Sequence, residues 1–191
     1  MTDSTNSWRV CGIAGSLREG SFNRALLRAA RELAPDELEI VIFEELARVP
    51  MFDADVEAEG DPDGVVALKE AIAAADGLLL VTPEYNAGVP APMKNAVDWA
   101  SRRHAGGAPV LKDMPAAVMG ATPGLLGTAR SQANLRISLA NTGAIVMEQP
   151  QVHLMRAKER IVDGELVDED SRTFVRALLE AFADWIGSFR G

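Results

Sequence analysis

Apolar residues follow two alternating patterns along the chain. Short continuous apolar runs are typical of strands buried on both faces of a sheet. Longer stretches repeat apolar residues at i, i+3, i+4 and i+7, as on one face of a helix. The short runs predict five strands, at residues 8–14, 38–43, 78–81, 116–119 and 144–147, the last with or without 152–155.

Helical spacing occupies the intervals between these strands. Pro92 opens the third helix, Gly143 follows the fourth, and Ser171 is the N-cap candidate of the fifth. Strands that alternate with helices in this way predict a doubly wound α/β fold with a five-stranded parallel sheet. The predicted helices are 22–33, 65–75, 93–101, 128–141 and 174–186.

The chain shows no internal repeat or linker that would divide it. With 191 residues, it is expected to form a single domain over 8–191, preceded by a flexible N-terminus at 1–7. The acidic stretch 53–63 contains glycine and proline and is predicted to be a solvated loop. A charged hairpin is predicted around Asp163-Gly164.

Composition and charge exclude several classes of protein. The net charge of −9 argues against a nucleic-acid or membrane-surface binder, so any anion site must be local. No apolar run approaches the roughly 18 residues of a membrane span. A single cysteine rules out an intrachain disulfide, and the polar start lacks the order of a signal peptide, so a cytoplasmic protein is expected.

Three loops that follow predicted strands carry unusual chemistry: 15–23, 82–90 and 120–127. In a doubly wound sheet, ligands bind outside the carboxyl ends of the strands where the strand order reverses. With the strand order 2-1-3-4-5, the first two loops flank that point and the third lies next to them. The sequence therefore predicts one crevice formed by all three loops.

The first loop fails two known phosphate-binding patterns. Its glycines, at 12, 15 and 20, do not have the spacing of a dinucleotide-binding loop. Ser21-Phe22 stands where the loop that binds nucleoside triphosphates has Lys-Ser/Thr. What remains is a terminal-phosphate site, with hydrogen bonds from Ser16, Ser21 and Asn23, a charge from Arg18, and a helix dipole. The alternative is a tight turn in which Ser21 only caps the helix.

The second loop is polar and stiffened by Pro83 and Pro90. Tyr85 adds a flat surface with a hydroxyl group. Such a loop can present fixed backbone groups to a planar heteroaromatic ring, or it can be a stiff connector with an exposed tyrosine. Both interpretations remain open on composition alone.

Five sequence stretches together resemble the NADPH-dependent FMN reductase family. They are Gly15-Ser-Leu-Arg-x-x-Ser-x-Asn23, Pro83-Glu-Tyr-Asn-x-x-x-Pro90 with Lys94-Asn-Ala-Val-Asp-Trp99, Val49-Pro-Met-Phe-Asp53, and Pro123-Gly-x-x-Gly-Thr-Ala-Arg130. The resemblance implies a flavodoxin-like fold, FMN as cofactor and NADPH or NADH as co-substrate. One departure is Gly88, where members of the family often carry serine.

The resemblance also implies which residues hold the cofactor. The phosphate would be held by the first loop, the isoalloxazine ring lined by the second, partly through backbone groups, and the other side closed by the third. The implied residues are Ser16, Arg18, Ser21 and Asn23 for the phosphate, Pro83, Glu84, Tyr85 and Asn86 for the ring, and Ala121, Thr122 and Gly124 for the third loop.

By this resemblance the protein is an oxidoreductase without a catalytic side chain of its own, since hydride chemistry takes place on FMN N5. NAD(P)H would reduce the flavin and a quinone or other small electron acceptor would reoxidise it, in a homodimer or homotetramer. The alternative is a flavodoxin-type electron carrier serving a protein partner, which the acidic net charge fits.

Several other residues are not assigned to the predicted site. Cys11 and His153 are expected to be structural. Arg102, Arg103 and His104 follow a helix, where cations complement the helix dipole or could grip NADPH. Trp99 and Phe52 are left open between the core, the flavin site and a subunit interface.

Overall fold

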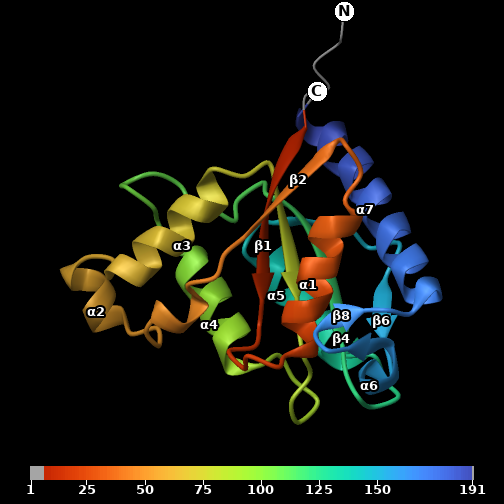
Figure 1. The fold of residues 1–191 in the computed structure, drawn as a ribbon. Coiled ribbons are helices and arrows are strands. Elements are labelled where there is room, and N and C mark those ends of the chain that lie inside the picture. Colours follow the sequence, from red (N-terminus) through yellow and green to blue (C-terminus); the bar gives the residue numbers. More distant parts are fainter. Residues whose placement is uncertain (1–6, 191) are drawn as a thin grey trace, which may run out of the picture.

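The protein is an α/β domain with one central parallel sheet, described here from a computed structural model that covers residues 7–190. The predicted flexible segment 1–7 therefore lies, apart from Ser7, outside the described residues. Figure 1 shows the sheet running through the middle of the molecule with helices on both sides. Within the described residues, no helix is long and apolar enough to span a membrane.

The sheet has the predicted strand order β2-β1-β3-β4-β5, with every neighbouring pair parallel. This confirms the doubly wound fold. A sixth strand, β6, pairs with the end of β4, so the prediction of five strands is corrected to six. The strands are β1 (Trp8–Ala14), β2 (Leu38–Ile42), β3 (Gly77–Val81), β4 (Pro115–Ala121), β5 (Ile145–Val146) and β6 (Val152–Leu154).

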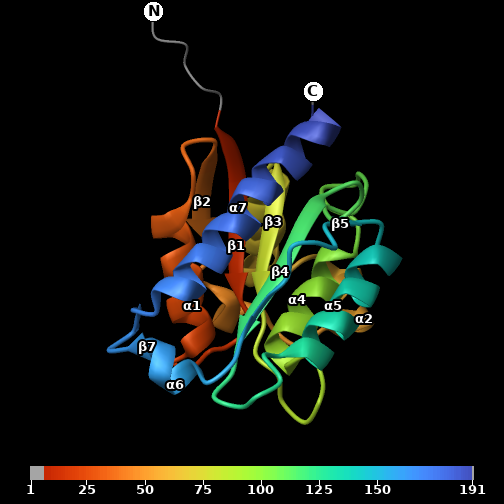
Figure 2. The ribbon, with the colours of Figure 1, turned by 90° about the vertical axis from the view of Figure 1, so that its right-hand side faces the viewer.

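Five helices cover the two faces of the sheet. Figure 2 shows α1 (Phe22–Leu33) and α7 (Glu169–Arg190) on one face, with α4 (Ala91–Ala100) and α5 (Ala129–Asn141) on the other. Helix α3 (Asp63–Ala73) packs beside α4. All five were predicted from the sequence, with boundaries that differ by a few residues.

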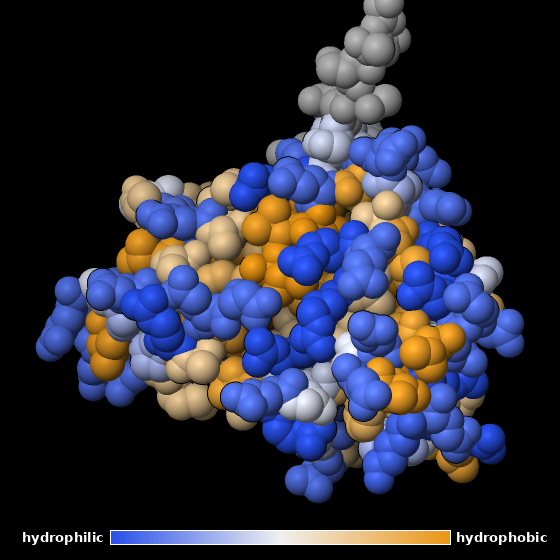
Figure 3. All heavy atoms as spheres, in the orientation of Figure 1, coloured by the Kyte–Doolittle hydropathy of each residue, from blue (hydrophilic) through white to orange (hydrophobic). Residues whose placement is uncertain are grey.

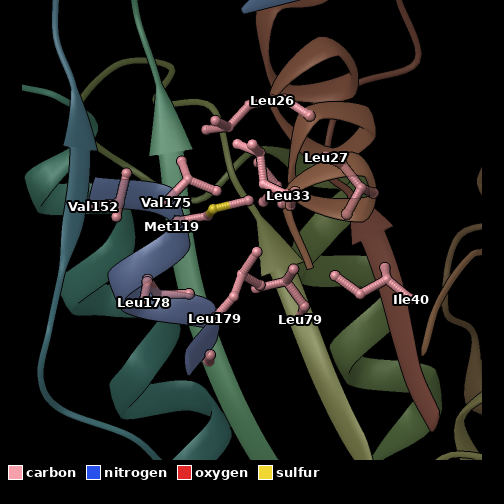
Figure 4. Close-up of a cluster of buried hydrophobic side chains, with 14 of the residues drawn as sticks. Leu26, Leu27, Leu33, Ile40, Leu79, Met119, Val152, Val175, Leu178 and Leu179 are labelled. Atoms are coloured by element: carbon pink, nitrogen blue, oxygen red, sulfur yellow. The ribbon is translucent and has the colours of Figure 1, made fainter. Parts of the chain in front are cut away.

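Alternate residues of the strands enter two separate cores. Val10 of β1 and Leu79 of β3 lie in the core under α1 and α7, part of which is shown in Figure 4. Their neighbours Cys11 and Leu78 lie in the core under α3, α4 and α5. Because both faces of the central strands β1, β3 and β4 are covered, these strands are continuous apolar runs, which is why they could be found in the sequence.

The last position of the sheet is shared by two short strands. β5 pairs with the start of β4 and β6 with its end. Between them, the half-buried Arg136 of α5 donates to Met147 O (2.6 Å) and Val118 O (3.1 Å). The amide of Gln132 donates to Val152 O (2.9 Å). Two side chains of one helix thus replace ladder bonds that an unbroken strand would make.

Two further predictions are wrong. The acidic stretch after Asp53 contains a short helix, α2 (Ala54–Glu59), whose first turn the Asp53 carboxylate caps by accepting from Asp55 N. The N-cap of α7 is Asp168 rather than Ser171, because its carboxylate accepts from Ser171 N at 2.9 Å. The predicted hairpin exists as β7 (Ile161–Val162) and β8 (Glu165–Leu166).

The fourth helix and the segment after Val49 form one interlocked unit. Pro50 O accepts hydrogen bonds from Asn95 Nδ2 and Trp99 Nε1, both at 2.8 Å, and Phe52 N donates to Asn95 Oδ1. Phe52 meets Trp99 edge to face, with ring centroids 4.9 Å apart. Trp99 is fully buried. Trp99 therefore belongs to the core, and the half-buried Phe52 packs against it.

Candidate functional site

The three predicted loops meet at the carboxyl ends of β1, β3 and β4 around a cleft of about 470 Å³. Nine of the eleven predicted site residues line it, and Asn86 and Gly124 line an adjoining hollow with Glu84 and Thr122. The cleft is lined by Ser16, Arg18, Ser21, Phe22, Asn23, Pro83, Glu84, Tyr85, Ala121, Thr122, Pro123 and Lys158.

A second groove of similar volume lies between β2 and α3. Val41 and Ala71 are among its lining residues, and Figure 3 shows an apolar area on this face of the molecule. Its charged lining residues are three glutamates, Glu44, Glu45 and Glu70, and one arginine, Arg9. A phosphate would be repelled there, whereas the cleft at the strand ends offers cations and hydroxyl groups. The charges therefore favour the strand-end cleft over this groove as a candidate anion site.

Helix α1 begins at the first loop. Ser21 Oγ accepts from Asn23 N (3.2 Å) and Arg24 N (3.3 Å), so Ser21 is the N-cap. Its hydroxyl proton remains able to donate toward the cleft, because a hydroxyl both accepts and donates. Ser16 is buried beside it, and the exposed Arg18 donates to Gly20 O at 2.8 Å. Capping and anion binding are thus compatible here.

Asn23 lines the cleft and also joins two elements of the fold. Its Nδ2 donates to Ala121 O (2.9 Å) and its Oδ1 accepts from Ala121 N (2.8 Å). The side chain is 2% exposed. Its carboxamide therefore fastens α1 to the end of β4 and retains only one N–H for any other partner.

The second loop ends in a two-residue hairpin turn. Tyr85 and Gly88 exchange backbone hydrogen bonds, while Asn86 (φ 51°) and Ala87 (φ 63°) occupy the left-handed region between them. This turn presents Tyr85, which is 53% exposed. A Cβ on Gly88 would meet only Tyr85 O, at 3.7 Å, so the serine of other family members would fit here.

Glu84 fastens the second loop to the start of α5. Its carboxylate accepts from Arg130 Nε (2.7 Å), Arg130 N (3.0 Å) and Ser131 N (3.2 Å), and its side chain is 7% exposed. Burial raises the pKa of Glu84, but the hydrogen bonds and the Arg130 charge outweigh it, and the pKa lies below 4.5. Glu84 is thus a fixed anion that positions the loop.

Close approach of the loops depends on small residues. A Cβ on Gly15 would lie 2.8 Å from Met93 Cβ and 3.4 Å from Pro83 Cδ. A Cβ on Gly120 would lie 2.2 Å from Thr82 O. Both glycines were part of the sequence patterns, and they allow the first and third loops to approach the second.

The sequence analysis missed Lys158. It lies on the short helix α6 (Ala157–Arg160), which follows β6. No motif marks this position, because it lies in a charged segment with no regular spacing. Only the folded chain brings α6 to the cleft.

Cys11, His153 and Arg102, which were not assigned to the predicted site, are held by local contacts. Cys11 is 3% exposed, and burial raises the pKa of its thiol to about 12. His153 contacts Gly127 O and Gln151 Oε1 through its ring nitrogens. Arg102 is paired with Glu57 of α2 (2.8 Å) and lies over the Phe52 ring. The role of Arg102, Arg103 and His104 in NADPH binding stays a prediction.

The donor set fits a phosphorylated planar ligand. One end of the cleft has buried hydroxyl groups, a guanidinium and a helix N-terminus, which suit a phosphate. The other end has Pro83 and Tyr85 on a rigid turn, which suit the face or edge of a ring. The volume is within the usual range for small-ligand sites. Fold and site together define a flavodoxin-like protein with a cleft for a mononucleotide.

The chain belongs to the NADPH-dependent FMN reductase family, whose model matches residues 8–159. It is 36% identical over 179 residues to a 2-hydroxy-1,4-benzoquinone reductase from Burkholderia sp, covering 93% of this chain and 96% of that protein. It is 38% identical over 184 residues to the quinone reductase of Escherichia coli, covering 93% and 95%.

A solved structure shares the whole fold. The flavoenzyme NAD(P)H:(acceptor) oxidoreductase from Paracoccus denitrificans superposes with a TM-score of 0.85 at 34% identity. The match covers 95% of this chain and 98% of that one. The two chains therefore share one fold over nearly their full length.

Proposed function

We propose that the protein is an FMN-dependent NAD(P)H oxidoreductase that reduces quinones or other small electron acceptors. The observation that carries the proposal is the cleft itself, where a phosphate-compatible loop and a rigid ring-compatible turn face one ligand-sized space. Family membership and relatives named as quinone reductases support it. FMN, when bound, supplies the two-electron chemistry that no side chain of the cleft can provide.

The chain's own residues bind and orient the cofactor in this proposal. Ser16, Ser21 and Arg18 hold the phosphate, assisted by the first turn of α1. Asn23 acts mainly by fixing the end of β4. The first and third loops therefore stay in register with each other while the phosphate is bound.

The second loop contacts the ring in this proposal. Pro83, Tyr85 and Asn86 offer backbone groups and a flat side chain, and Glu84 keeps the loop in place through Arg130. Thr122 and Gly124 close the opposite side. The neighbouring hollow of about 280 Å³, which these residues also line, leaves room for the second substrate beside the cofactor.

The test is spectroscopic. Purified protein is mixed with FMN, freed of excess cofactor, and then mixed with NADPH or NADH in a stopped-flow instrument without oxygen. Retained flavin absorbance that bleaches rapidly, followed by turnover with a benzoquinone, supports the proposal. Retained flavin that no nicotinamide bleaches would instead support an electron carrier. Protein that retains no flavin would refute both.

Two coarser properties complete the proposal. A homodimer or homotetramer is inferred from family membership, and light scattering after gel filtration tests it, with a monomer as the contrary result. A cytoplasmic location fits a chain whose single cysteine remains a buried thiol. Fractionation of cells that express the tagged chain would test this location.

A further inference from the structure

Lys158 is a cation of the cleft that comes from a distant part of the chain. It is exposed and lines the cleft together with the first loop. Within residues 7–190, no carboxylate forms an ion pair with its ammonium group. In a chain with a net charge of −9, an unpaired lysine beside a phosphate-compatible loop is a specific feature.

Backbone hydrogen bonds fix the position of this lysine. Arg156 takes a left-handed conformation (φ 49°), which turns the chain directly after β6. Its N–H donates to Gly124 O (3.1 Å), and the N–H of Ala157 donates to Thr122 O (3.0 Å). The start of α6 is therefore attached to the third loop, one residue before Lys158.

The same helix lies on the α1 side of the cleft. The β7–β8 hairpin, which follows α6 directly, packs against α1, and Arg28 of α1 donates to Gly164 O at 3.3 Å. In Figure 2, α6 lies near the first turn of α1 at the lower left, whereas the yellow-green loop that contains residues 85–88 lies at the lower right. Lys158, as a residue of α6, therefore enters the cleft from the side that α1 forms.

We propose that Lys158 supplies the second positive charge for the cofactor's terminal phosphate. Arg18 of the first loop provides the other charge. A phosphate monoester carries between one and two negative charges near neutral pH, so a single guanidinium neutralises it incompletely. The pair makes the cleft select FMN over riboflavin, which has the same ring but no phosphate. This inference rests on the proposed function and assigns to it a residue that determines the specificity for FMN.

The test compares two flavins and two lysines. Apoprotein is titrated with FMN and with riboflavin, following the quenching of flavin fluorescence. Wild type, Lys158→Gln and Lys112→Gln are measured at two salt concentrations. Lys112 is an exposed lysine just before β4, at the opposite end of the sheet, so it is a matched control for the loss of one charge.

The expected result is selective. Lys158→Gln should weaken FMN binding by about tenfold, the effect of losing one charge-assisted contact, and riboflavin binding by less than twofold. The loss should shrink at high salt, because exposed charges are screened. Lys112→Gln should change neither affinity. The melting temperature of Lys158→Gln is the folding control. A shift of no more than about 2 °C from wild type corresponds to a small change in stability and shows that the variant folds.

Three outcomes would overturn the inference. Equal weakening of FMN and riboflavin would mean that Lys158 supports the loop structure instead. Unchanged FMN affinity with a raised KM for NADPH, but not for NADH, would assign the lysine to the nicotinamide nucleotide's extra phosphate. Wild-type protein that binds neither flavin would remove the proposed function, and this inference with it.

Discussion

The side-chain amide of Asn23 and the backbone of Ala121 exchange two hydrogen bonds, one in each direction, across 98 positions of the chain. Asn23 lies in the first turn of α1 and Ala121 is the last residue of β4. The bonds join the first and third loops behind the cleft. This pair couples the phosphate end of the site to the stability of the sheet.

Replacing Asn23 by alanine should destabilise the protein by about 2–3 kcal/mol. It would leave the buried N–H and C=O of Ala121 without partners, and each buried unsatisfied group costs roughly 1–3 kcal/mol. Urea denaturation of the apoprotein measures the effect. Asn134→Ala, at an exposed position of α5, is the control and should change little. Unchanged stability with lost FMN binding would instead make Asn23 a direct phosphate ligand, as the sequence suggested.

Replacing Arg18 by alanine should leave the fold intact and weaken FMN binding by about 1.5–3 kcal/mol. The reason is the loss of a charge-assisted hydrogen bond to the phosphate. Arg18 is exposed and its guanidinium donates to the nearby Gly20 O, so stability should be nearly unchanged. Fluorescence titration with FMN and riboflavin measures the effect. An unchanged FMN affinity would make the loop a capped turn and nothing more.

Replacing Glu84 by glutamine should cost about 1–3 kcal/mol at neutral pH, since a buried charged acceptor of three N–H groups is lost. The folded pKa of Glu84 is depressed, so its contribution is fully present above the ordinary value of 4.5 and is lost as the pH falls through the folded value. The difference from wild type should therefore disappear in acid. Urea denaturation of both proteins from about pH 3 to about pH 7, a range that includes the titration of carboxyl groups, measures this difference.

Glu44→Gln is the matched control for Glu84. Glu44 also pairs with an arginine, Arg24 at 2.9 Å, but its side chain is 59% exposed. Exposed pairs contribute little, so this change should cost well under 1 kcal/mol at any pH. Equal effects of the two substitutions would show that burial of Glu84 does not increase the contribution of its ion pair to stability.

Replacing Arg136 by methionine should destabilise the protein by about 2–4 kcal/mol. Its guanidinium serves Met147 O and Val118 O at the gap in the last sheet position, and methionine has no donor for either. Burial lowers the pKa of Arg136, and the Glu148 charge opposes this. Arg31→Met, at an exposed position of α1, is the control. Equal stabilities in urea would mean that water satisfies the two carbonyl groups.

Replacing Ala87 by glycine should stabilise the turn of the second loop by about 0.5–1 kcal/mol. Ala87 has φ 63°, a conformation that costs an L-residue roughly 1–2 kcal/mol. Glycine avoids this cost, but its greater freedom in the unfolded chain offsets part of the stabilisation. Thermal unfolding measures the change. Asn86→Gly should gain less, because asparagine tolerates this region better. A fall in stability with Ala87→Gly would contradict the strained turn.

Patterns that depend on neighbouring residues were predictable from the sequence. The strands buried on both faces gave continuous apolar runs, and the three loops that form the cleft were located by their position after β1, β3 and β4. The strand order then placed the loops together. Local composition and topology were enough for the fold and for most of the cleft.

Features that depend on distant partners were not predictable. The role of Asn23 is set by Ala121, and Lys158 reaches the cleft only because Thr122 and Gly124 hold the chain beside it. The division of the last strand depends on Arg136 from a different element. The α2 helix was missed for another reason, since none of its residues is buried and it therefore has no apolar face to detect.

The gap between β5 and β6 separates two tasks that one strand usually performs together. β5 completes the sheet at the start of β4, while β6 leads into α6 at the cleft. Residues 147–151 join them without belonging to either strand. A change of length or sequence in this connection can therefore re-aim α6 while the register of β5 is kept. The fold thus offers evolution a place to vary the choice of ligand without rebuilding the sheet.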